Sequence, residues 1–306
     1  MIRGIKQQDI KKGSIFLVLT MAILSSAFAK KAESPKIPQR IVSLSPAGSE
    51  ILCAVGAIDQ IVARTDYCDY PEKLTALPTV GGFDGKTLSL EKIVSYKPDF
   101  VYGSKGMHDY LVPSLNKMGI SVYLSDAKSL DAVYTEIAYI GQFTGHAEAA
   151  SQVVAGMKAK ITAIHNKIES YYQDASKKGT TKNPAVYYEV WNSPFMSAGR
   201  TSFISELISA AGGRNIFSDL ADEYPMVSEE AILARKPEVI LIPDMESETI
   251  DSLGKRNGWK MIPAVQDKKI YFVDSNICSR PGPRITQAVL ILAKAIHPEI
   301  DFSDIQ

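Results

Sequence analysis

The sequence is poor in the features from which most catalytic and metal sites are built. Its four histidines are scattered, and no spacing among them would build a zinc site. It has no G-x-S-x-G element, the nucleophile elbow of α/β-hydrolases. GGFDGKT (81–87) is one residue short of the phosphate-binding loop G-x-x-x-x-G-K-[ST]. We therefore expect no enzymatic activity and no resident metal or cofactor, and we keep an exported hydrolase only as a distant alternative.

Cysteine is scarce and odd in number, which rules out a complete disulfide framework. Cys53 lies in the apolar helical run EILCAVGA and is predicted to be a buried thiol. Cys68 and Cys278 fall in predicted loops of different halves of the chain, so a bridge between them stays open as a less favoured alternative. Three histidines, namely His146, His165 and His297, are predicted to be solvated.

An excess of charge of either sign is also absent, because 34 basic side chains face 34 acidic ones. Residues 1–29 hold four of the basic residues and one of the acidic residues, so the chain from Lys30 onward has 30 basic and 33 acidic side chains. This balance gives no electrostatic footprint for nucleic acid or for an anionic membrane surface.

The first 29 residues are typical of a secretory signal peptide. A basic start precedes the apolar run Ile15–Leu24, and Ala27-Phe28-Ala29 is a small-x-small cleavage site. The apolar run is shorter than the roughly 20 residues that span a bilayer, and no cysteine for lipid attachment lies near the cleavage site. We expect a cleaved, periplasmic protein that begins at Lys30 and has no membrane anchor.

A short segment occurs twice, 139 residues apart. Residues 89–102 read SLEKIVSYKPDFVY and residues 228–241 read SEEAILARKPEVIL, with five of fourteen positions identical. Each copy reads as a serine-capped helix with glutamate in its first turn, ended by Lys-Pro and followed by an apolar strand. A helix–strand unit repeated half a chain apart predicts two similar lobes that enclose a cleft.

The remaining pattern supports two α/β lobes. Apolar strands at 40–44, 60–64, 120–125 and 186–191 alternate with helical segments, which predicts mostly parallel sheets covered on both faces. From about 146 to 176, apolar residues recur at steps of three and four, which marks a continuous helix. We therefore divide the chain into a signal peptide (1–29), a first lobe (30–143), a connecting helix (144–178) and a second lobe (179–306).

These segments resemble the substrate-binding proteins of ABC importers for cobalamin, iron-siderophores and haem. The likeness covers essentially the whole chain after the signal peptide. It lies in RIVSLSPAGSEILCAVGA, TDYCDYP, LPTVGGF, LEKIVSYKPDFVY, SPFMSAGRTSFISELISAAGGRNIF and SRPGPR, and it is greatest toward the periplasmic cobalamin (vitamin B12) binders. The resemblance implies the class III periplasmic binding protein fold, in which one long helix joins two lobes and the ligand occupies the cleft unchanged.

The resemblance also implies a function and partners. We expect a monomer that captures cobalamin or a related corrinoid and delivers it to the permease dimer of an ABC importer. An iron-siderophore or haem is the alternative ligand, and a ligand-loaded sensor without its own permease is a third role. The sequence departs from the family at Ser104, where cobalamin binders can place an aromatic side chain, and this departure could suit another corrinoid or an anionic siderophore. Ser104 opens room, and the neighbouring Lys105 adds positive charge.

Aromatic residues are the candidate walls of the site, because a corrin or porphyrin is a wide, partly apolar disc with a polar fringe. Four aromatics lie in loops that follow predicted strands, where ligands collect in α/β sheets, and each matches a wall position of the cobalamin binders. They are Tyr67, Phe83, Phe195 and Tyr224. Trp191 is nearby but could belong to the core of the second lobe.

Two polar residues near the C-terminus are candidate rim contacts. Arg280 in SRPGPR matches a family position that reaches ligand amides or acidic groups, although it could instead brace its own loop. Asn276 lies where a polar partner is expected. Finally, Glu91 and Glu230 are equivalent acids, one in each copy of the repeat. Each could serve the helix dipole, but the matching family positions dock arginine pockets of the permease, and we favour docking.

Overall fold

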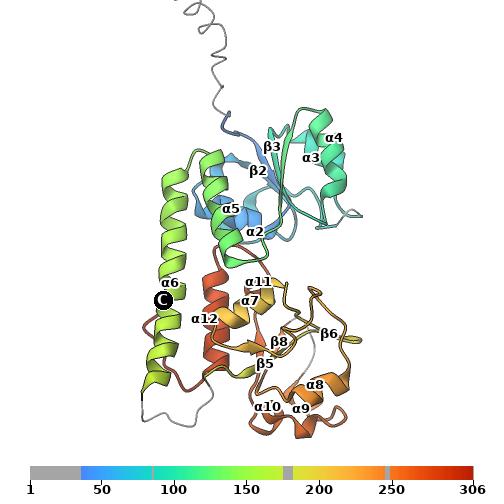
Figure 1. Ribbon diagram of the computed structural model, residues 1–306. Helices are drawn as coiled ribbons and strands as arrows, with labels where there is room; N and C mark the ends of the chain where they lie inside the picture. The colour runs from blue at the N-terminus through green and yellow to red at the C-terminus, as the bar shows by residue number, and fades with distance from the viewer. Residues whose placement is uncertain (1–35, 85, 175–181, 245–248, 306) are drawn as a thin grey trace, which may run out of the picture. The chain divides into compact units, whose positions relative to one another are not determined.

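The computed structural model describes residues 36–84, 86–174, 182–244 and 249–305 (Figure 1). The predicted signal peptide and residues 175–178 of the predicted connecting helix lie outside the described residues. Within the described part of the chain, no helix combines the length and the apolar character that a bilayer crossing requires.

The first lobe is built on a four-stranded sheet with the order β2-β1-β3-β4, and every pairing is parallel. Its strands are β1 (Ile41–Ser43), β2 (Ile61–Arg64), β3 (Phe100–Ser104) and β4 (Ser121–Ser125). Its α-helices are α2 (Pro46–Ala54), α3 (Leu90–Ser95), α4 (Val112–Lys117) and α5 (Leu130–Phe143). Ile41 and Phe100 join one buried cluster while Val42 and Val101 join another, so both faces of this sheet are covered. The predicted parallel α/β lobe is confirmed.

The second lobe has a mostly parallel sheet with the order β6-β5-β8-β9, and β7 also pairs with β5. Its strands are β5 (Ala185–Asn192), β6 (Phe195–Ser197), β7 (Arg214–Asn215), β8 (Val239–Pro243) and β9 (Ile270–Val273). Its α-helices are α7 (Phe203–Ala210), α8 (Glu229–Arg235), α9 (Ile250–Leu253), α10 (Pro263–Gln266), α11 (Ser275–Cys278) and α12 (Ile285–Ile296). Among the strand pairings that the structure describes in this lobe, β5–β6 is the antiparallel one, and it forms a hairpin at one edge.

The sequence repeat corresponds to a structural repeat. Ser89 caps α3 and Ser228 caps α8, each through its side-chain oxygen. The lysine of each Lys-Pro pair is not helical, as predicted, because Lys97 has φ 50° and Lys236 has φ 46°. The strands that follow, β3 and β8, each pair with two neighbours in their sheet. The two copies therefore occupy equivalent places in the two lobes.

The long helix α6 (Ala147–Gln173) contacts α5 of the first lobe and α12 of the second (Figure 1). It has 27 residues, about 40 Å at the helical rise. Its buried side chains include Met157, Ile164 and Ile168, which belong to a cluster that extends through both lobes. The predicted continuous helix is confirmed, and it packs on both lobes along its length.

Two details of the core correct the sequence-based picture. His297 is fully buried instead of solvated, because its ring packs beside Tyr172 and its Nδ1 lies 3.0 Å from the Tyr172 hydroxyl. The second correction concerns Cys53, whereas the less favoured Cys68–Cys278 bridge is absent, because all three cysteines are free. Cys53 is only partly buried against the core, although burial still raises the pKa of its thiol to about 11.

Candidate functional site

A cavity of about 1000 Å³ lies between the two lobes. The first lobe contributes loops that follow its strands, including Tyr67 after β2 and Lys128 after β4. The second lobe contributes the start of α7, the loop at Tyr224 and the segment at Arg280. On the side of the first sheet, the cavity thus lies at the carboxyl ends of parallel strands, where α/β proteins hold their ligands. Its volume is at the upper end of ordinary ligand sites and suits a large ligand.

Three of the four predicted aromatic walls line this cavity. Tyr67 and Phe83 come from the first lobe and meet edge to face, with ring centroids 6.4 Å apart. Tyr224 comes from the second lobe, and burial raises the pKa of its phenol. The Tyr67 side chain is 58% exposed, so a ligand in the cavity could cover it. Apolar ring surface therefore faces the cavity from both lobes.

Phe195, the fourth predicted wall, does not line the cavity. The β5–β6 hairpin carries its ring to the other core of the second lobe, where it packs 5.9 Å from Trp259. The Arg256 guanidinium lies 5.1 Å from the Phe195 ring on that side. Trp191 is also absent from the cavity lining, and it is exposed instead of belonging to the core. Strand pairing across the hairpin, which the local sequence did not reveal, decides both positions.

The Phe83 wall is held by a buried histidine that sequence reasoning treated only as one of four scattered residues. His108 Nδ1 accepts a hydrogen bond from the Ser104 N–H at 2.9 Å. Nε2 therefore carries the proton and donates it to the Phe83 carbonyl at 3.0 Å. The His108 ring also packs edge to face on Phe83, with centroids 5.3 Å apart. Burial lowers the pKa of His108, which favours the neutral ring that this arrangement needs.

Arg280 lines the cavity, but its guanidinium is occupied by protein partners. Its Nη1 donates to Asp69 Oδ1 at 2.8 Å and lies 3.4 Å from Glu50 Oε1, and both acids belong to the first lobe. Its Nη2 donates to Asn276 Oδ1 at 2.6 Å. Of the two roles weighed for Arg280, these contacts favour bracing. Burial acts to raise the pKa of Asp69, but the hydrogen bond and charge of Arg280 outweigh it and lower that pKa.

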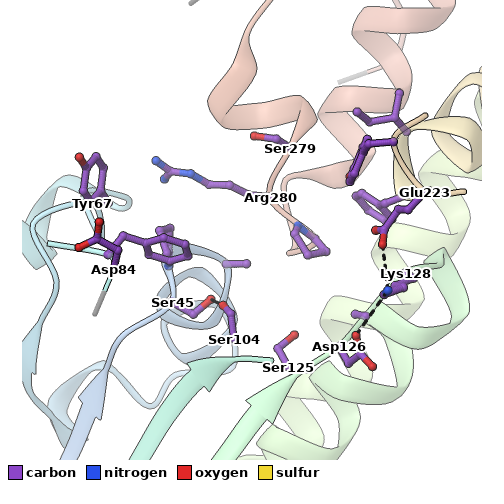
Figure 2. A pocket seen from close by; sticks show the side chains of 18 of the residues that line it. Ser45, Tyr67, Asp84, Ser104, Ser125, Asp126, Lys128, Glu223, Ser279 and Arg280 are labelled. Carbon is purple, nitrogen blue, oxygen red and sulfur yellow. Dashed lines mark hydrogen bonds and ion pairs between the residues drawn. The ribbon is translucent and has the colours of Figure 1, made fainter. Parts of the chain in front are cut away.

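Asn276 and Lys105 do not line the cavity. Asn276 is exposed and serves as a partner of Arg280, so any effect on a ligand passes through that arginine. Lys105 Nζ pairs at 2.7 Å with Oδ2 of Asp126, which does line the cavity. The positive charge that the sequence suggested at this wall is therefore neutralised locally. Ser104 does line the cavity, and its hydroxyl donates to Ser45 Oγ at 3.1 Å (Figure 2).

The charged groups of the cavity lining are mostly acidic. The lining includes four carboxylates and two cations. The carboxylates are Asp66, Asp84, Asp126 and Glu223, and the cations are Lys128 and Arg280. Lys128 Nζ, from the first lobe, lies 3.0 Å from Oε2 of Glu223 in the second lobe (Figure 2), and Arg280 is held as described above. Both cations are thus already paired with acids of the protein.

Glu91 and Glu230 are exposed and do not line the cavity. Glu91 Oε2 accepts the Ser89 hydroxyl at 2.9 Å. Hydrogen bonds from the helix backbone and then from the capping serine lower the pKa of both glutamates. The neighbouring Glu229 differs, since its Oε1 accepts the indole N–H of Trp259. Each copy of the repeat thus presents one ionised, outward-facing glutamate.

Comparison with known proteins agrees with this geometry. The family model described as "Periplasmic binding protein" matches residues 41–277. An uncharacterized ABC transporter substrate-binding lipoprotein of Bacillus subtilis is 30% identical over 86% of this chain and 82% of its own length. A vitamin B12-binding protein of Vibrio campbellii is 28% identical over 82% of this chain and 86% of its own. The apo structure of a periplasmic heme-binding protein from Roseiflexus superposes with a TM-score of 0.73 at 28% identity, covering 85% of this chain and 98% of that one.

Proposed function

This chain belongs to the periplasmic binding protein family, and from that premise we propose that it captures cobalamin or a related corrinoid and delivers it to an ABC importer. The cavity has the volume for a large ligand, and Tyr67, Phe83 and Tyr224 give it aromatic surface on both lobes. The likeness to vitamin B12-binding proteins supports the same ligand class.

The charge of the cavity lining is the observation that favours cobalamin over haem as the ligand. A porphyrin such as haem has carboxylates on its fringe, whereas the corrin ring of cobalamin has carboxamides. Four protein carboxylates line the cavity against two cations, and those cations, Lys128 and Arg280, are paired with acids of the protein. Two of the four acids are themselves paired with lysines, Asp126 with Lys105 and Glu223 with Lys128. A ligand carboxylate would therefore face mainly Asp66 and Asp84 as like charges, and it would compete for cations that are already occupied. A carboxamide would instead meet acceptors for its N–H groups.

Haem or an iron-siderophore is the second candidate, and one observation favours it. The exposed phenol of Tyr67 lies in the cavity lining, and a tyrosine oxygen is a known axial ligand of haem iron. The likeness to a heme-binding protein supports the same alternative. On this account the ligand would be recognised through its iron instead of through its fringe.

Delivery is proposed to use Glu91 and Glu230. Their equivalent positions in the structural repeat offer two matched, ionised carboxylates outside the ligand cavity. Each carboxylate could bind a basic pocket on one subunit of a dimeric permease. Such contacts would be strong, because hydrogen bonds between charged groups are stronger than those between neutral groups. A monomeric binding protein satisfies this symmetry by itself, since each lobe supplies one acid.

Export and domain division complete the proposal. Residues 1–29 are proposed to be removed as a signal peptide, so that the protein begins at Lys30 in the periplasm. The lobes would then comprise residues 30–143 and 179–306, joined by residues 144–178. Membrane-bound protein that retains residues 1–29 would contradict this part of the proposal.

The absorption spectrum of protein purified from the periplasm of its native host tests the ligand directly. Cobalamins, haem and ferric siderophores absorb at different wavelengths, so a co-purified ligand identifies itself. We expect a corrinoid spectrum that disappears on denaturation and dialysis. A haem spectrum or a ferric siderophore spectrum would select the second candidate.

A further inference from the structure

Two serine hydroxyls on the first-lobe side of the cavity are hydrogen-bonded to protein partners. Ser125, at the end of β4, donates to Glu136 Oε2 at 2.8 Å. Ser104, at the end of β3, donates to Ser45 Oγ at 3.1 Å. A hydroxyl has one proton and two lone pairs. Because the partner of Ser125 is a carboxylate, the Ser125 hydroxyl can only accept hydrogen bonds from a ligand, whereas the partner of Ser104 is a second hydroxyl that can also donate.

Glu136 of α5 fixes the orientation of the Ser125 hydroxyl. Its side chain is buried, the Tyr102 hydroxyl donates to Oε1, and Ser125 donates to Oε2. Burial raises the pKa of Glu136, against the lowering effect of the hydrogen bonds from Tyr102 and Ser125. While this carboxylate is ionised it has no proton to give, so both neighbours act as donors. If Ser125 turned its proton toward a ligand, Oε2 would lose a hydrogen bond in a buried place, which is costly.

Tyr102 can act only as a hydrogen-bond donor to Glu136. Burial, together with the charge of Glu136, raises its pKa well above the ordinary value, so the phenol keeps its proton and remains a donor. Its ring fits because Gly48 of α2 lies against it, and a β-carbon at that position would approach the ring to 1.9 Å. The buried Tyr102–Glu136–Ser125 chain thus ends at the cavity as a hydrogen-bond acceptor.

We propose that Glu136 is a specificity-determining positioning residue, which makes the Ser125 wall an acceptor surface that selects carboxamide over carboxylate groups of the ligand. A carboxamide donates two N–H bonds and so pairs with this wall. A carboxylate has no donor, so neither its own oxygens nor the lone pairs of Ser125 would gain a hydrogen bond there. This inference rests on the proposed function and names the chemical group by which the ligand is recognised.

The test compares cyanocobalamin with its three propionate monocarboxylates, in each of which one side-chain amide is hydrolysed. Each pair has the same size and differs only at one fringe group. We expect the wild-type protein to bind at least one isomer about tenfold or more weakly than the parent, the cost of a buried unpaired group. Equal affinity for all three isomers and the parent would overturn the inference while leaving corrinoid binding intact. No binding of the parent would instead overturn the proposed function.

Two variants separate orientation from overall charge. In Glu136→Gln, the new amide can donate to Ser125, so the serine proton turns toward the ligand and the discrimination should fall to about threefold or less. Ser125→Ala removes the hydroxyl but keeps the Glu136 charge, and it should also reduce the discrimination. If only Glu136→Gln reduces it, long-range charge is responsible and the inference is wrong. Glu148→Gln, an exposed change on α6, should keep the wild-type ratio.

Discussion

Glu50 of the first lobe and Arg284 of the second form a buried ion pair with two hydrogen bonds. Arg284 Nε donates to Glu50 Oε2 at 2.9 Å and Nη2 donates to Oε1 at 2.6 Å. The Glu50 side chain is 2% exposed. The Arg284 guanidinium also lies 4.0 Å from the Tyr70 ring, and the hydrogen bond to Glu50 raises the pKa of this arginine. This pair joins α2 to the start of α12 beside the ligand cavity.

Breaking this pair should destabilise the protein strongly. Glu50→Gln removes the charge while keeping the shape, and it leaves Arg284 buried without a carboxylate. Loss of one partner of a buried pair typically costs about 3–5 kcal/mol in the free energy of unfolding. Denaturant unfolding monitored by circular dichroism measures it, with the exposed Glu148→Gln as control. A loss no larger than that of the control would contradict the assigned role.

The aromatic walls can be separated from the core aromatic by mutation. Tyr67→Ala, Phe83→Ala and Tyr224→Ala should each weaken cobalamin binding by about 1–3 kcal/mol, because apolar contact with the ligand is lost. Phe195→Ala should leave the affinity unchanged and lower the melting temperature, because its ring packs on Trp259. Calorimetric titration and thermal melts measure both effects. A Phe195→Ala variant that binds as weakly as the other three would refute this division of roles.

The sequence predicted the two-lobed framework because its signals are local. Serine caps, first-turn glutamates and Lys-Pro ends are read within one helix–strand unit, and both copies form as expected. The connecting helix follows from the three-and-four spacing of its apolar residues, of which Met157, Ile164 and Ile168 are buried. Three of the aromatic wall residues could also be predicted, because they lie in loops at the edge of the cavity.

The remaining site features depend on contacts between distant segments. Arg280 is occupied by Asp69 and Glu50 across more than 200 residues of sequence. His108 meets the carbonyl of Phe83, and Phe195 turns away across a hairpin. No local pattern encodes these distances. The sequence therefore identified which residues come to the cavity better than it identified what each one does there.

His108 predicts how stability should vary with pH. Its pKa in the folded protein is lowered by burial, against opposing effects of the Phe83 hydrogen bond and the Asp109 charge. As the pH falls through the ordinary histidine value of about 6.5, the unfolded chain takes up the proton first. The contribution of His108 to the free energy of unfolding is fully present above about pH 6.5. It decreases as the pH falls from that value to the lower pKa that His108 has in the folded protein. The melting temperature should accordingly fall between pH 7 and pH 5.

A matched variant isolates this histidine from His297, whose pKa is also lowered by burial. His108→Asn keeps an acceptor near the position of Nδ1 but does not titrate. Its melting temperature should depend less steeply on pH than that of the wild type, and its cobalamin affinity should be lower because the Phe83 carbonyl loses its donor. Identical slopes for the two proteins would show that His108 does not contribute to the pH dependence.

Docking can be separated from capture with a double substitution. Glu91→Ala with Glu230→Ala should leave cobalamin affinity intact, because neither residue lines the cavity. Uptake by cells should drop by roughly tenfold or more, since two charge-assisted contacts to the permease are lost. Reversal of both charges to lysine should impair uptake further. The control is the pair Glu72→Ala with Glu148→Ala, two other exposed acids, and unimpaired uptake in the Glu91/Glu230 variant would refute the docking role.

The central claim is that the cavity between the lobes binds a corrinoid. Fluorescence titration of the chain that begins at Lys30 tests it most directly, with cyanocobalamin, haemin and a ferric hydroxamate as separate ligands. We predict that cyanocobalamin quenches the tyrosine and tryptophan emission and saturates at one equivalent, and that the Tyr67→Ala variant saturates at a higher concentration. Saturable quenching by haemin or the ferric hydroxamate, with no response to cyanocobalamin, would contradict the account.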